Sequence, residues 1–217
     1  MPRAERERQM LDAAVRVFGK RGYRAASMDE IAELAGVSKP LVYLYLNSKE
    51  DLFSACIRRE AEALVDAVRA GVRTDVAADR QLWEGLTAFF AHTAERPDGW
   101  AVLHSQARSG GDSSSESQLR SSKGDPVVAE VGAMREEIVA FVTHLIAEAA
   151  REAHDNPELA EREVAGLAQA LVGAAEALAD WANGDATVSA KEAATTLMNF
   201  SWSGLGNLMD GERWSAR

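Results

Sequence analysis

Residues 27–46 read SMDEIAELAGVSKPLVYLYL, and this stretch carries the signals for two short helices joined by a tight turn. Ser27 and Glu30 form a capping-box pattern, in which the two side chains satisfy free N–H groups at a helix start. Gly36 supplies the left-handed geometry that ends a helix, and Ser38 is placed to cap the next one. The stretch therefore predicts a helix-turn-helix, although an ordinary pair of packed helices has the same spacing.

The second of these helices has a definite outer face. If Val42 points inward, steps of about 100° per residue point Pro40 and Leu44 outward. An α-helix fits the major groove of DNA, where apolar side chains contact thymine methyl groups. We expect Pro40 and Leu44, with Leu41 and Tyr43 on the flanks of this face and Lys39 in the first turn, to meet base edges.

One helix precedes this pair and another follows it. Apolar residues at helical spacing predict a helix over about Glu5–Lys20, with Gly22 in the turn after it. Ser48 is placed to cap the fourth helix, beside Lys49. A cation and N–H donors therefore converge on one phosphate-sized spot.

Residues 35–52, AGVSKPLVYLYLNSKEDL, closely resemble the signature of the tetracycline-repressor (TetR) family of bacterial transcriptional regulators, as do residues 18–23 and 27–33. The resemblance implies an all-helical homodimer in which three N-terminal helices bind DNA. It also implies that Tyr43 and Tyr45 contact DNA and that Lys49 binds a phosphate. Leu46 departs from the pattern, because the family generally has phenylalanine there. The candidate DNA-binding residues are Ser27, Ser38, Lys39, Pro40, Leu41, Tyr43, Leu44, Tyr45 and Lys49.

The rest of the chain also has helical spacing, and it contains no alternating β pattern. We expect an all-α protein of about nine helices. Its predicted parts are a helix-turn-helix DNA-binding domain over 1–48 and a larger helical ligand-binding and dimerisation domain over 49–217. The Ser- and Gly-rich stretch Ser109–Asp125 is interpreted as a surface connector or as a gate over a ligand pocket.

Composition excludes several classes of protein. The 217 residues are 47% hydrophobic and 27% charged, as in ordinary globular proteins. A lone cysteine, Cys56, excludes a disulfide framework and a zinc finger, and we expect neither a metal nor a cofactor. The net charge is −10, yet residues 1–49 hold nine basic against six acidic side chains, which suits a local phosphate-binding face. The start resembles no signal peptide, and no apolar run approaches the roughly 20 residues of a membrane span. We therefore expect a cytoplasmic protein.

Small residues mark two helices near the C-terminus. They form stripes over residues 165–175 and 193–208. Such stripes let helices approach closely, either in a twofold interface of a homodimer or in packing within one subunit.

Aromatic residues and two histidines gather in the middle of the chain. His104 and His144 lie on otherwise apolar helices, where each is a buried histidine with a hydrogen-bond partner, a polar anchor in a ligand pocket, or a metal ligand. The candidate ligand-binding residues are Leu86, Phe90, Leu103, His104, Phe141, His144 and Trp181.

These observations predict a repressor that a small, largely hydrophobic ligand releases from a palindromic operator in double-stranded DNA. The charge of −13 over residues 50–217 favours a neutral or cationic ligand. One alternative is a regulator of the same fold that a protein partner controls or that has no ligand. Another is a serine hydrolase using His104 or His144. The chain lacks a Gly-x-Ser-x-Gly motif, so we expect no enzyme.

Overall fold

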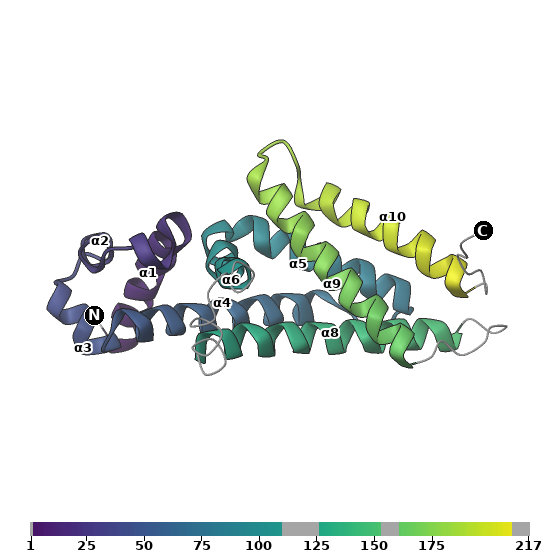
Figure 1. Cartoon of the computed structure of the whole chain (residues 1–217), viewed down its shortest axis with the longest axis horizontal. Coiled ribbons are helices and arrows are strands. Elements are labelled where there is room, and N and C mark those ends of the chain that lie inside the picture. The colour runs from purple at the N-terminus through teal and green to yellow at the C-terminus, as the bar shows by residue number, and fades with distance from the viewer. Residues whose placement is uncertain (1, 110–125, 153–160, 210–217) are drawn as a thin grey trace, which may run out of the picture. The chain divides into compact units, whose positions relative to one another are not determined.

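The computed structural model describes residues 2–109, 126–152 and 161–209, and every regular element in these ranges is an α-helix (Figure 1). The helices are α1 (Arg3–Ala25), α2 (Met28–Leu34), α3 (Lys39–Leu46), α4 (Lys49–Gly71), α5 (Ala78–Glu95), α6 (Pro97–Ser109), α8 (Pro126–Glu152), α9 (Glu161–Gly184) and α10 (Ala190–Met209). The predicted all-α fold is confirmed. The stretch interpreted as a connector or a gate lies, from residue 110 to 125, outside the described residues.

The chain forms two compact units. Unit 1 comprises Met1–Ala63 and Arg96–Met134, and unit 2 comprises Leu64–Glu95 and Arg135–Arg217. The chain passes between the units within α4, between α5 and α6, and within α8. The division into domains at residue 49 stays a prediction.

The core of unit 1 is built from the apolar faces of long and short helices. Phe18 of α1 is buried, and its ring meets the ring of Phe53 of α4 edge-on at 4.8 Å between centroids. Ile31 and Val42 bring α2 and α3 into the same unit with fully buried side chains. Gly22, at φ 72°, interrupts α1 where the sequence predicts a turn. The short helices are therefore held by tertiary burial, since helices of this length are marginal alone.

Unit 2 packs α5 against α9 and α10. Small residues allow the close approach, because Ala168, Ala175, Ala193 and Ala194 are buried. Part of the small-residue stripes thus serves packing within the chain. None of the helices in the described ranges is long and apolar enough to cross a membrane.

Candidate nucleic-acid interface

The turn between α2 and α3 has the predicted geometry. Gly36 adopts φ 66°, the left-handed region. Its N–H donates to the Glu33 carbonyl at 3.0 Å, and the N–H of Val37 donates to the Ala32 carbonyl at 3.0 Å. These bonds close the end of α2 and fix the direction in which α3 begins.

The two serines that precede these helices behave differently. The Ser27 hydroxyl accepts the N–H of Asp29 at 3.2 Å and so caps α2. Glu30, predicted to bond back to Ser27, instead lies 3.6 Å from Arg21 in an ion pair. Ser38 is exposed at the start of α3, and its side chain makes no capping bond.

α3 separates an apolar inner side from an exposed outer side. Val42 is fully buried, and Leu46 is buried in place of the family's phenylalanine. Leu44, on the outer side, is 73% exposed. Of the remaining α3 candidates, Lys39, Pro40 and Tyr43 are exposed, and Leu41 and Tyr45 are half-buried. The orientation agrees with the helical spacing, while contact of these side chains with DNA stays a prediction.

Lys39 is engaged in an ion pair. Its Nζ atom lies 2.9 Å from Oδ2 of Asp29 on α2. The hydrogen bond with this carboxylate raises the pKa of Lys39 above its usual value. This bond uses one of the three N–H donors of the Lys39 ammonium, and the other two can still bind an acceptor on DNA.

Lys49 is held where α1 ends and α4 begins. Its Nζ atom lies 4.8 Å from the centre of the Tyr23 ring and 3.5 Å from the Arg24 carbonyl oxygen. The Ser48 hydroxyl accepts the N–H of Asp51 at 2.9 Å, which is the predicted cap of α4. Lys49 is the first residue of α4, and the acidic Glu50 and Asp51 belong to the same turn. The predicted phosphate site at this helix start stays a prediction.

The sequence analysis does not identify two residues that contact the candidate DNA-binding region, Tyr23 and Arg3. The Tyr23 hydroxyl donates to Glu50 at 2.6 Å, and this bond lowers the pKa of Glu50. The Arg3 guanidinium lies over the ring of Tyr45 at 5.2 Å, next to α3. The only sequence signal for Arg3 is its place among the basic residues at the start of the chain.

The predicted ligand-binding residues lie on four helices of the two units. Leu86, Phe90 and Leu103 are buried, His104 and Phe141 are half-buried, and Trp181 is exposed. The His104 ring stacks on Trp100 at 5.2 Å. The His144 side chain is 62% exposed and lies 3.6 Å from Glu148 on the same helix. The prediction that His144 is a buried histidine is therefore wrong, because the spacing placed it on the wrong side of α8.

A cavity of about 310 Å³ lies among α8, α9 and α10 of unit 2. Its lining is apolar apart from one hydroxyl, and consists of Ile146, Leu167, Ala170, Leu171, Ala174, Phe200, Ser201 and Gly204. None of the seven predicted ligand-binding residues lines this cavity.

The helix-turn-helix with an exposed α3 defines a class of protein, the helical DNA-binding regulators. Residues 10–56 match the family of bacterial regulatory proteins called the tetR family, and residues 78–204 match the tetracyclin repressor-like C-terminal domain. The chain belongs to the TetR family of DNA-binding transcriptional regulators.

Relatives agree with this assignment. The chain is 33% identical to the HTH-type transcriptional activator FasR of Mycolicibacterium smegmatis over 96% of this chain and 86% of that protein. A TetR-like regulator from Rhodococcus sp. RHA1 superposes with a TM-score of 0.77 at 34% identity, over 95% of this chain and 98% of that one. AibR, solved in complex with isovaleryl coenzyme A and operator DNA, shares the fold at a TM-score of 0.70 and 19% identity, over 90% and 97% of the two chains.

Proposed function

We propose that this protein binds a near-palindromic operator as a homodimer, and that a small, largely hydrophobic ligand releases it. The exposed outer side of α3 carries the proposal. Leu44 and Tyr43 face solvent there, while Val42 anchors the helix in the core. A short helix so fixed enters the major groove as a unit, with Lys49 on an adjacent phosphate.

Exposed apolar surface on α9 and α10 supports the homodimer. Phe200 is 77% exposed and Trp181 is 51% exposed. A Cβ atom added at Gly166, Gly173 or Gly204 would meet no atom within 4 Å. Open glycines beside exposed aromatic side chains suit a second copy of the same helices, which would also cover the cavity lined by Phe200.

Buried apolar side chains in unit 2 support a hydrophobic ligand. Leu86 and Phe90 are buried on α5, and Phe141 of α8 lies 3.9 Å from where a Cβ of Gly85 would stand. A 100-fold loss of DNA affinity needs about 2.7 kcal/mol of differential binding. Burial of roughly 110 Å² of apolar ligand surface supplies that amount.

A release assay tests this function. An operator is first selected from genomic fragments, labelled with a fluorophore and bound by the protein. Anisotropy is then followed with neutral apolar compounds, hydrophobic cations, acyl thioesters of coenzyme A and small polar anions. We include the thioesters because AibR was solved with one of them. Release by an apolar class supports the proposal, and release by small polar anions alone contradicts it.

The direction of regulation needs a separate measurement. We propose repression, whereas the relative FasR is an activator. Transcription in vitro from the selected promoter should fall when protein is added and recover when the releasing compound follows. A rise of transcription on adding protein would contradict repression while leaving DNA binding intact.

A further inference from the structure

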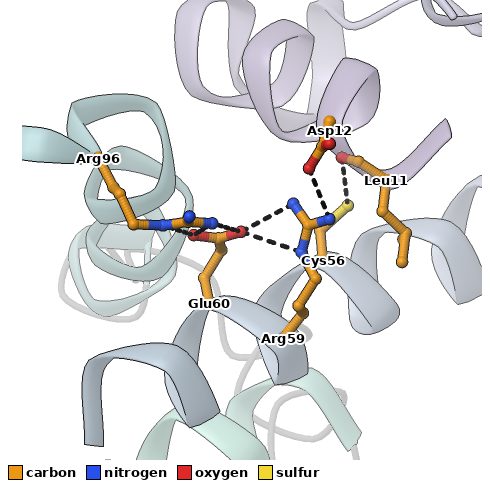
Figure 2. A network of polar contacts seen from close by, with 6 residues as sticks. All are labelled: Leu11, Asp12, Cys56, Arg59, Glu60 and Arg96. Atoms are coloured by element: carbon orange, nitrogen blue, oxygen red, sulfur yellow. Dashed lines mark hydrogen bonds and ion pairs between the residues drawn. The ribbon is translucent and has the colours of Figure 1, made fainter. Parts of the chain in front are cut away.

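A buried carboxylate lies within unit 1. Glu60 of α4 is 1% exposed, and its carboxylate accepts bonds from two arginines (Figure 2). Arg96 donates from Nε to Oε2 at 3.0 Å. Its Nη2 atom donates to Oε1 and to Oε2, at 2.8 Å in each case. Arg59 donates to Oε1 from Nε at 3.2 Å and from Nη2 at 2.9 Å. Burial of an ion is costly unless it is paired in this way.

The network continues to the first DNA-binding helix. The Nη1 atom of Arg59 lies 2.8 Å from Oδ1 of Asp12 on α1 (Figure 2). Arg59 therefore joins Glu60 to α1. One chain of ion pairs thus connects α1, α4 and the residue that precedes α6.

Arg96 occupies a special place in the chain. α5 ends at Glu95 and α6 begins at Pro97, so Arg96 is the single residue between them. The boundary between units 2 and 1 falls directly before it. Glu60 therefore binds the residue at which the chain enters unit 1 from α5.

Two glycines bring the first turn of α6 into direct contact with α1 and α4. A Cβ at Gly19 of α1 would stand 2.6 Å from the carbonyl oxygen of Asp98. A Cβ at Gly99 would overlap the carboxylate of Glu60. Because neither glycine carries a side chain, the backbone of this turn lies directly against α1 and against the Glu60 carboxylate, and a shift of the turn displaces both neighbours.

We propose that Glu60 is a positioning residue that couples the α5–α6 joint to the DNA-binding helices. A shift of α5 on ligand binding moves Arg96, and the Glu60 carboxylate transmits this movement to α4 and, through Arg59, to α1. The inference rests on the proposed ligand response. The alternative is that the network only stabilises unit 1.

Reciprocity allows a test without a known ligand. If the joint influences DNA binding, then DNA bound at α3 must also alter the joint. The experiment measures amide hydrogen exchange with and without the selected operator DNA, in the wild type, in Glu60→Gln and in Arg96→Gln. In the wild type, DNA should change exchange by about fivefold or more for amides of residues 91–102, as it does in α2 and α3.

The variants separate coupling from stability. Both should bind DNA within about threefold of the wild type and keep the DNA-dependent protection in α2 and α3, yet lose the change over 91–102. The control, Glu176→Gln, removes the carboxylate that Arg135 contacts at 3.1 Å between α8 and α9 and should retain every change. If Glu60→Gln does not fold, Arg96→Gln decides, because the Arg96 side chain is 42% exposed and Arg59 still pairs with Glu60.

Two results would overturn the inference. One is a wild type in which DNA leaves amide exchange over residues 91–102 unchanged. The other is a folded variant in which DNA changes this exchange as much as in the wild type. Anisotropy on the same samples reports DNA binding independently, and the ligand panel reports release, so a failed coupling is distinguishable from a failed function.

Discussion

The Lys49 side chain is held against another part of its own chain. Its ammonium lies over the Tyr23 ring, so we expect binding of a DNA phosphate to cost little side-chain entropy. We predict that Lys49→Ala weakens binding to operator and random DNA alike and lowers the salt slope, log K against log salt, by about 0.9. Lys191→Ala, at an exposed lysine of α10, is the control and should leave the slope unchanged. An unaltered slope in Lys49→Ala would remove this lysine from the phosphate site.

Leu44 is an exposed apolar side chain of α3, and we expect it to cover a thymine methyl group. Burial of one methyl group contributes about 0.8 kcal/mol, or roughly fourfold in affinity. We predict that replacing the contacted thymine by deoxyuridine weakens wild-type binding by this factor, because deoxyuridine lacks only the methyl group. Leu44→Ala should bind both operators equally. If deoxyuridine at each thymine position lowered the affinity of the wild type and of Leu44→Ala by the same factor, Leu44 would contact none of these methyl groups.

At the scale of the helix, local signals explain what the sequence predicts and what it misses. α2, its turn and the cap of α4 follow from residues within a few positions of each other, such as Gly36 and Ser48. Glu60 stands in the apolar row of Leu52, Cys56 and Leu64, and a charge in such a row signals a buried ion. Its partner, Arg96, lies 36 residues further on, and spacing along one helix cannot identify it.

The contact of α1 with α6 depends on one missing side chain. A Cβ at Gly19 would press on the backbone of Asp98, which cannot rotate away. We predict that Gly19→Ala lowers the free energy of unfolding by about 1–3 kcal/mol, as in other overpacked contacts. Gly132→Ala is the control, since its Cβ meets open space on α8 and should stabilise by about 0.5–1 kcal/mol. Urea unfolding measures both, and a stabilised Gly19→Ala would contradict the close contact.

Arg73, two residues after the end of α4, is joined to α5 by an ion pair with a titratable carboxylate. Arg73 donates to Glu84 from its backbone N–H at 3.0 Å and from its guanidinium, and these bonds lower the pKa of Glu84 from 4.5 to about 2. Because the folded pKa is depressed, its stabilisation is present above pH 4.5 and is lost as the pH falls towards 2. We predict that Glu84→Gln flattens the pH dependence of the melting temperature in this window. An unchanged acid slope would contradict this assignment.

At the scale of the whole molecule, the sequence predicts a second domain but not its ligand site. The sequence makes Phe90 and Phe141 candidates because they are aromatic, a property that serves core packing and ligand contact equally. It makes His144 a candidate because the neighbouring residues are apolar, yet His144 faces solvent. Helical spacing identifies buried faces, whereas a cavity depends on how several helices meet, and that information is spread over the whole chain.

The homodimer is the last prediction, and it connects α9 and α10 to the operator. Gly173 has open space where a Cβ would stand, so an arginine there does not disturb the subunit's own packing. In a twofold interface the same change places two large cations against apolar surface. We predict that Gly173→Arg is a folded monomer in light scattering at micromolar concentration, whereas the wild type and the control Gly132→Arg are dimers. A monomer reaches one half-site of the operator, whereas a dimer spans two half-sites that lie about 34–36 Å apart, or a multiple of that distance. Gly173→Arg should therefore also lose its preference for the palindrome over a single half-site. A monomeric wild type, or a dimeric Gly173→Arg, would place the interface elsewhere or remove it.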